Sequence, residues 1–235
     1  KVMVEIMVST AALGIYTAAA KIPALINVIV SIFQQAWEIS VIKEIETTNE
    51  SDYYSDVFKY LFLFTSGACL VFVTIIKVFM HYYIGIEFAD AWRYVPLLLV
   101  SAVFAAVASY YGSMYGALKK SVNNMFTTLL AAAVNIVING LLIPFMGIWG
   151  AVIGTLIAYI VVAFARMIDV RRYMMISVNC KTFLSISVII LIHAIAVSLD
   201  FHIYAISLLA ILAFVSINLH DLGILVKKFS KFILR

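Results

Sequence analysis

Residues 121–165 read SVNNMFTTLLAAAVNIVINGLLIPFMGIWGAVIGTLIAYIVVAFA and contain no Asp, Glu, Lys or Arg over 45 residues. A helix that crosses a bilayer needs about 20 apolar residues, so this stretch is too long for one membrane span. Pro and Gly together mark a turn, and Ile143-Pro144-Phe145-Met146-Gly147 divides the stretch. The sequence therefore predicts two membrane helices, at about Val122–Ile143 and Ile148–Ile168, joined by a short turn over Pro144–Gly147.

The composition of the whole chain is also that of a membrane protein. Of 235 residues, 65% are hydrophobic and 12% are charged, whereas soluble domains average about 25% charged residues. In lipid every backbone polar group must be paired internally, so only helices or closed barrels can span a membrane. The long unbroken apolar runs favour helices, because barrel strands alternate apolar and polar residues. We therefore predict an all-α membrane protein.

Five further apolar runs have the length of a span, which gives about seven transmembrane helices. They lie at about Val8–Phe33, Phe58–Met80, Tyr94–Leu118, Thr182–Leu199 and Ile203–Val226. A polar segment at about Lys43–Asp56 is expected to form a solvated connection between two helices. We expect residues 1–170 to hold the first five spans, and residues 171–235 to form a two-helix hairpin with a basic tail.

The distribution of Lys and Arg predicts the orientation, because cytoplasmic loops carry an excess of these residues. Three cations, Lys1, Lys77 and Arg93, fall on one side of the seven-helix arrangement. Twelve fall on the other side: Lys43, Lys59, Lys119, Lys120, Arg166, Arg171, Arg172, Lys181, Lys227, Lys228, Lys231 and Arg235. The N-terminus of the chain is therefore predicted to lie outside and the C-terminus in the cytoplasm.

Lys21 is a candidate cavity residue. It lies within the first predicted span, where a charge is costly and usually faces the bundle interior or an aqueous cavity. Snorkelling to the membrane surface, or an ion pair with another helix, are the structural alternatives. Pro23 lies two residues further on and predicts a bend in this helix, because it lacks a backbone N–H.

Amide side chains are the other candidates for a substrate cavity. Asn135 and Asn139 are four residues apart and share one helix face, and Asn27 and Gln34 are seven apart. Interhelical hydrogen bonding is the alternative role for such amides. Small residues at Gly150 and Gly154, and the weaker pair Gly112 and Gly116, are expected to allow close packing of helices.

Nothing in the sequence predicts an enzyme. No Ser-His-acid set, paired carboxylates or Gly-rich phosphate loop occurs, and the predicted outer loops are too short for a catalytic segment. Cys69 and Cys180 have no second Cys or His at metal-ligand spacing. We expect neither metal nor cofactor, and no nucleic-acid partner.

Several segments together resemble bacterial polysaccharide flippases of the Wzx type. They are LGIYTAAAKIP at 13–23, QQAW at 34–37, YVPL at 94–97, YGALKK at 115–120, NIVIN at 135–139 and LIPFMGIWGAVIGT at 142–155. These flippases belong to the superfamily that also holds the MATE multidrug exporters and the lipid II flippase. The resemblance lies in the order and spacing of the segments over about 170 residues.

The resemblance implies a fold and a function. Such proteins have two lobes around a central cavity and move an undecaprenyl-pyrophosphate-linked oligosaccharide across the bacterial inner membrane for surface polysaccharide (O-antigen, lipopolysaccharide) synthesis. The chain would be the C-terminal half, one lobe plus a terminal helix pair, with an N-terminal lobe missing before Lys1. Lys21 would contribute charge to the cavity, and Asn27, Asn135 and Asn139 would contribute polar contacts.

Two alternatives stay open at this point. A MATE-type exporter coupled to a cation should carry buried carboxylates, whereas Glu5 and Glu38 are expected near the ends of the first span and Asp169 near the cytoplasmic face. The chain could also be an inactive fragment.

Overall fold

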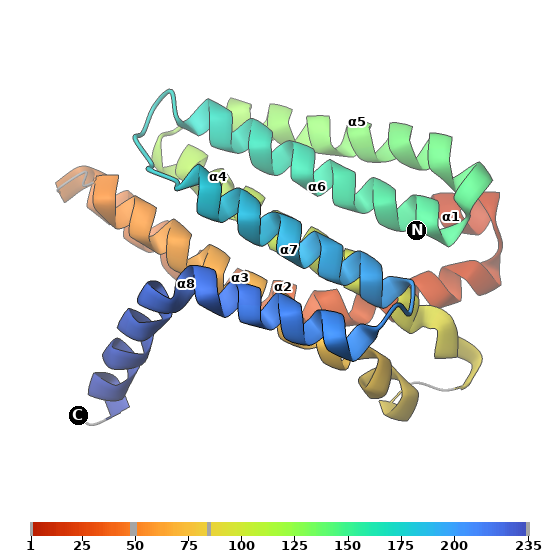
Figure 1. Cartoon of the computed structure of the whole chain (residues 1–235). Coiled ribbons are helices and arrows are strands. Elements are labelled where there is room, and N and C mark those ends of the chain that lie inside the picture. The colour runs from red at the N-terminus through yellow and green to blue at the C-terminus, as the bar shows by residue number, and fades with distance from the viewer. Residues whose placement is uncertain (1, 48–50, 84–85, 234–235) are drawn as a thin grey trace.

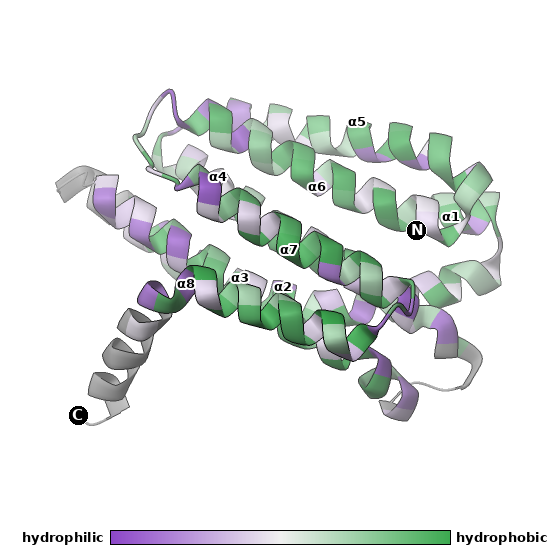
Figure 2. Cartoon of the chain, in the orientation of Figure 1, coloured by the Kyte–Doolittle hydropathy of each residue, from purple (hydrophilic) through white to green (hydrophobic). Residues whose placement is uncertain are grey.

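The computed structural model describes residues 2–47, 51–83 and 86–233. Its elements are α1 (Val2–Met7), α2 (Thr10–Thr47), α3 (Ser51–Tyr83), the 3-10 helix η1 (Ile86–Arg93), α4 (Val95–Ala117), α5 (Ser121–Met146), α6 (Ile148–Val170), α7 (Cys180–Ser198) and α8 (Ile203–Ile233). Figure 1 shows the long helices packed lengthwise into one bundle, and Figure 2 shows their mostly apolar surfaces. Seven of them, α2 to α8, are long and apolar enough to cross a membrane. The predicted all-α membrane fold with seven spans is confirmed.

The first predicted span ends much too early. α2 continues past Phe33 to Thr47, because the intervening residues include no Pro or Gly and contain two Gln and three Glu, which favour helix. The connection expected at Lys43–Asp56 is therefore shorter than predicted. α3 already begins at Ser51, and residues 48–50 lie outside the described ranges.

The turn predicted over Pro144–Gly147 is present but shorter than predicted. Pro144 lies inside α5, which ends only at Met146. The helix stops because Gly147 has a φ of 55°, a conformation that glycine adopts without a steric penalty. The Gly147 N–H donates to the Ile143 carbonyl over 2.8 Å, and α6 starts at the next residue. The turn between α5 and α6 is thus a single residue.

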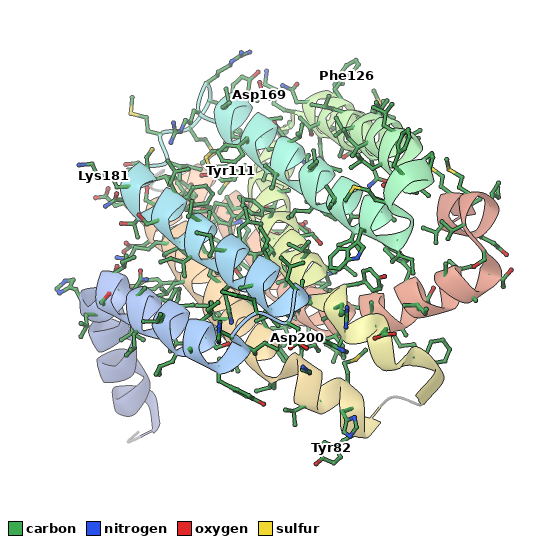
Figure 3. The ribbon with its side chains drawn as sticks, turned by 45° about the vertical axis from the view of Figure 1, so that its right-hand side comes forward. Tyr82, Tyr111, Phe126, Asp169, Lys181 and Asp200 are labelled. Atoms are coloured by element: carbon green, nitrogen blue, oxygen red, sulfur yellow. The ribbon has the colours of Figure 1, made fainter. Side chains whose placement is uncertain are left out.

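α4 lies at the centre of the bundle and α5 at its edge. α4 contacts α2, α3, α6 and α7, whereas α5 contacts chiefly α6. In the membrane-crossing part of α4, 89% of the residues are buried, whereas in that of α5 only 11% are buried. Phe126 is one of the many apolar α5 side chains that stay exposed, as Figure 3 shows. α4 therefore acts as the scaffold on which the other helices are positioned.

α8 is fixed to α3 near both ends of the bundle. Lys77 Nζ lies 2.6 Å from Asp200 in the turn between α7 and α8, and Lys59 Nζ lies 2.6 Å from Asp221 in α8. α8 kinks at Asn218, where the backbone is non-helical, and its last part leaves the bundle (Figure 1). α7 also contacts α3 and α4. A separate unit from residue 171 onward stays a prediction.

The orientation can be tested with the natural cysteines, because Cys180 is exposed and Cys69 is buried. Asp169 and Lys181 lie toward one end of the bundle, and Asp200 toward the other (Figure 3). We expect a membrane-impermeant maleimide to label Cys180 only in permeabilised cells. In a Cys180→Ser background, Phe201→Cys, at an exposed position of the α7–α8 turn, should be labelled in intact cells. Labelling of Cys180 from outside would reverse the assigned topology.

Candidate functional site

A cavity of about 560 Å³ lies among α2, α4, α5 and α6. α4 contributes small residues, among them Ala105, Ser109 and Ser113, which leave the space open. α6 contributes Tyr159 and a single cation, described below. The cavity is thus lined largely by polar and small side chains.

The α2 wall of the cavity carries a stripe of polar side chains. Asn27, Ser31, Gln34 and Glu38 line the cavity, at spacings of three and four residues that place them on one helix face. The Gln34 amide nitrogen is buried and has no hydrogen-bond partner within the described part of the chain. The sequence-predicted candidate Asn27 therefore lies at the site, and Glu38 lies near the end of the membrane-spanning part of α2, Thr10–Val41, as predicted.

Lys21 lies on a different side of α2. It is exposed and precedes Asn27 by six residues, which at about 100° per residue places it about 120° around the helix. It shares this side with the exposed residues Leu25 and Val28. A cavity role for Lys21 stays a prediction. α2 is continuous through Pro23, and the bend expected there stays a prediction as well.

Asn135 and Asn139 lie away from this cavity. The Asn139 amide donates to Asn135 Oδ1 over 2.9 Å, and Asn139 is buried with its oxygen against Gly154 of α6. A Cβ at Gly150 would come within 2.5 Å of the Leu142 carbonyl carbon of α5. The two amides therefore belong to a close α5–α6 contact in this structure, and a substrate role for them stays a prediction.

Arg166 is the cation of the cavity, and the sequence reasoning missed it. Its Nε donates to Thr127 Oγ1 over 3.0 Å, and its Nη1 donates to the Ala108 carbonyl over 2.8 Å. Its Nη2 donates to Asn124 Oδ1 over 2.7 Å and to Thr128 Oγ1 over 2.9 Å. One α6 side chain thus holds both α4 and α5.

Gly112 makes room for this guanidinium. A Cβ at Gly112 would lie 2.5 Å from Arg166 Nη1, whereas a Cβ at Gly116 would meet nothing within 4 Å. The sequence analysis counted Arg166 among the cytoplasmic loop cations, although the span predicted at Ile148–Ile168 already contained it. That position inside a span was the signal that could have identified it.

A second polar cluster lies one turn further along α6. Asp169 Oδ2 accepts hydrogen bonds from Tyr115 Oη over 2.9 Å and from Asn123 Nδ2 over 2.8 Å. Arg172 lies 3.7 Å from the other carboxylate oxygen. Asp169 therefore also joins α4 to α5, at the end of the bundle that the charges predict to be cytoplasmic.

The fold and the cavity define a helical membrane lobe with one polar wall. No protein-family model matches the chain, and no curated protein matches it in sequence. A solved structure of the lipid II flippase MurJ, in an inward closed conformation, is similar, with a TM-score of 0.63 and 16% identity. The match covers 95% of this chain and 48% of that chain. At this identity the similarity shows the fold alone, and the chain spans about half the length of that flippase.

Proposed function

We propose that the chain is one lobe of a flippase that moves a lipid-linked oligosaccharide across the bacterial inner membrane. The polar α2 stripe of the cavity carries this proposal. Amides and hydroxyls that line a membrane-embedded cavity are suited to hydrogen bonding with the hydroxyl groups of a glycan, which cannot enter the hydrocarbon region unpaired. An undecaprenyl-pyrophosphate-linked oligosaccharide fits this arrangement, with its lipid chain remaining in the bilayer.

The facing wall of the cavity is expected to come from a second lobe. Transporters built from repeated lobes place the substrate between them and rock one lobe against the other. The similarity to MurJ over half of that protein's length supports this arrangement, and surface polysaccharide synthesis, including O-antigen, is the role we propose. An N-terminal lobe of the same protein is the proposed partner.

A cation-coupled multidrug exporter is the second candidate, and Glu38 is the observation that bears on it. It is the acid among the residues that line the cavity, but its side chain is exposed. A coupling carboxylate is usually desolvated so that its affinity for a cation or proton is high. The other three residues of the stripe, Asn27, Ser31 and Gln34, are neutral hydrogen-bonding groups, which favours a glycan.

Retention of glycolipid by the purified chain tests the proposed function. We expect native mass spectrometry to detect a complex with a short undecaprenyl-pyrophosphate-linked oligosaccharide. The double variant Asn27→Leu/Gln34→Leu should reduce retention about thirtyfold, because two hydrogen-bonding groups, each worth about 1 kcal/mol, are lost. Lys21→Gln, measured in the same assay, tests the prediction that the charge of Lys21 contributes to substrate binding.

The control replaces a polar residue outside the cavity. Ser185 of α7 is exposed, and Ser185→Leu should leave retention unchanged at equal protein abundance. Equal retention by the parent and the double variant would show that the α2 stripe does not bind the glycan. Preferential retention of an apolar organic cation would instead support the exporter.

A further inference from the structure

Arg166 is a partly buried cation without an anionic partner. All four acceptors of its hydrogen bonds are neutral: two threonine hydroxyls, one asparagine amide and one backbone carbonyl. Within the described part of the chain no carboxylate lies within 4 Å of it, whereas Lys59 and Lys77 each have one. A charge removed from water is costly unless an opposite charge compensates it. Glu38 lines the same cavity, but the guanidinium of Arg166 has no direct ion-pair partner among the described residues.

The same side chain is a main polar link between α5 and the bundle. α5 buries few residues, and the Nη2 group of Arg166 holds Asn124 and Thr128 of α5. Both of these residues and Arg166 itself line the cavity. A ligand in the cavity can thus reach the guanidinium from the side on which α5 is bound.

We propose that Arg166 is an anion-responsive latch: a phosphate group in the cavity takes over the Nη2 donors from Asn124 and Thr128 and loosens the part of α5 that follows Thr127 from α6. Arg binds phosphate through two parallel N–H···O bonds to a group of opposite charge, whereas the amide and the hydroxyl are neutral acceptors, so we expect phosphate to displace them. This inference rests on the proposed function in so far as it identifies the phosphate with the pyrophosphate of the lipid-linked substrate.

The released helix should pivot rather than detach. Asn123, next to Asn124, remains bonded to Asp169, and Thr127 Oγ1 of α5 still accepts from Arg166 Nε. The far end of α5 is joined to α6 through the turn at Gly147. Only the segment of α5 between these fixed points is free to move, and this segment borders the cavity.

The test measures anion binding and helix position in the same protein. Spin labels are placed at two exposed positions, Leu129→Cys on α5 and Phe64→Cys on α3, in a Cys69→Ala/Cys180→Ser background. The full chain is held in nanodiscs of zwitterionic lipid and titrated with inorganic pyrophosphate. We expect saturable binding by calorimetry, with a changed label–label distance distribution in double electron–electron resonance.

The variants separate the charge of Arg166 from its hydrogen bonds. Arg166→Gln should weaken binding at least tenfold, and its distance distribution should no longer respond to pyrophosphate. Arg171→Gln, an exposed Arg near the same helix end, is the matched control and should bind like the parent. Thr128→Val removes one competing acceptor while keeping the Arg, so it should bind pyrophosphate about fivefold more tightly.

The source of the anion is distinguished by a second set of nanodiscs that contain phosphatidylglycerol and no pyrophosphate. The same distance change in these discs would assign the latch to a bilayer headgroup, and its absence would assign it to the substrate phosphate. Unchanged distances in the parent, or equal pyrophosphate binding by Arg166→Gln and Thr128→Val, would overturn the proposal. A distance change with pyrophosphate but no glycolipid retention would support the latch and contradict the proposed substrate. Glycolipid retention without a distance change would support the proposed substrate and contradict the latch.

Discussion

Gly150→Ala is expected to destabilise the protein by about 3 kcal/mol, the upper range for overpacking of a close contact. The added Cβ would lie 2.5 Å from the Leu142 carbonyl carbon and 2.6 Å from the Ile143 nitrogen. Both atoms belong to the α5 backbone, which cannot move aside as a flexible side chain can. The free energy of unfolding, measured in mixed micelles by titration with dodecyl sulfate and circular dichroism, should fall accordingly.

Gly116→Ala is the matched control for this substitution. Its Cβ would meet nothing within 4 Å, and Ala favours a helix over Gly by up to about 1 kcal/mol. The control should therefore be neutral or slightly stabilising. If Gly150→Ala unfolds at the same detergent fraction as Gly116→Ala, the close contact between α5 and α6 does not exist.

Tyr110→Ala is expected to cost about 4 kcal/mol, as is typical when a fully buried aromatic side chain is truncated. The Tyr110 ring stacks on Trp37 of α2 with ring centroids 5.1 Å apart. Its hydroxyl donates to the Tyr54 carbonyl of α3 over 2.6 Å. The residue thus joins α2 and α3 to α4, so its loss should also weaken glycolipid retention by the α2 stripe.

Tyr110→Phe separates the hydrogen bond from the packing. It keeps the ring and should cost only about 1 kcal/mol, the net value of a typical hydrogen bond. The same detergent titration reports both variants. Equal losses for Ala and Phe would show that the hydrogen bond to α3, and not the aromatic contact with Trp37 of α2, accounts for the stabilisation by Tyr110.

The spans were predictable because their signal is local. The uncharged run from Ser121 to Ala165 must hold two helices on length alone, whichever residues surround it. Helix ends were less predictable, since they depend on single backbone conformations. Pro144 indicated a turn, yet the helix ends two residues after it, where Gly147 adopts a positive φ.

The candidate site was predicted only in part, because a cavity is made by helices distant in sequence. Asn27 and Gln34 could be placed on one face from their spacing. The position of Arg166 inside a predicted span could have identified it as a candidate, but its partners could not be predicted, because they are Ala108 on α4 and three residues on α5. Sequence spacing gives the face of one helix, but not the helix that this face meets.

The one-residue turn at Gly147 has a consequence for how the chain is made. α5 and α6 are separated by no polar loop that a translocon could pass to the outside on its own, so we expect the two segments to leave it together as a helical hairpin. Lys119 and Lys120 before α5, and Arg171 and Arg172 after α6, would retain both ends on the cytoplasmic side. The amides of Asn135 and Asn139 would then meet the hydrocarbon already paired with each other. Biogenesis of this region would proceed by co-insertion of a preassembled pair, not by addition of one helix at a time.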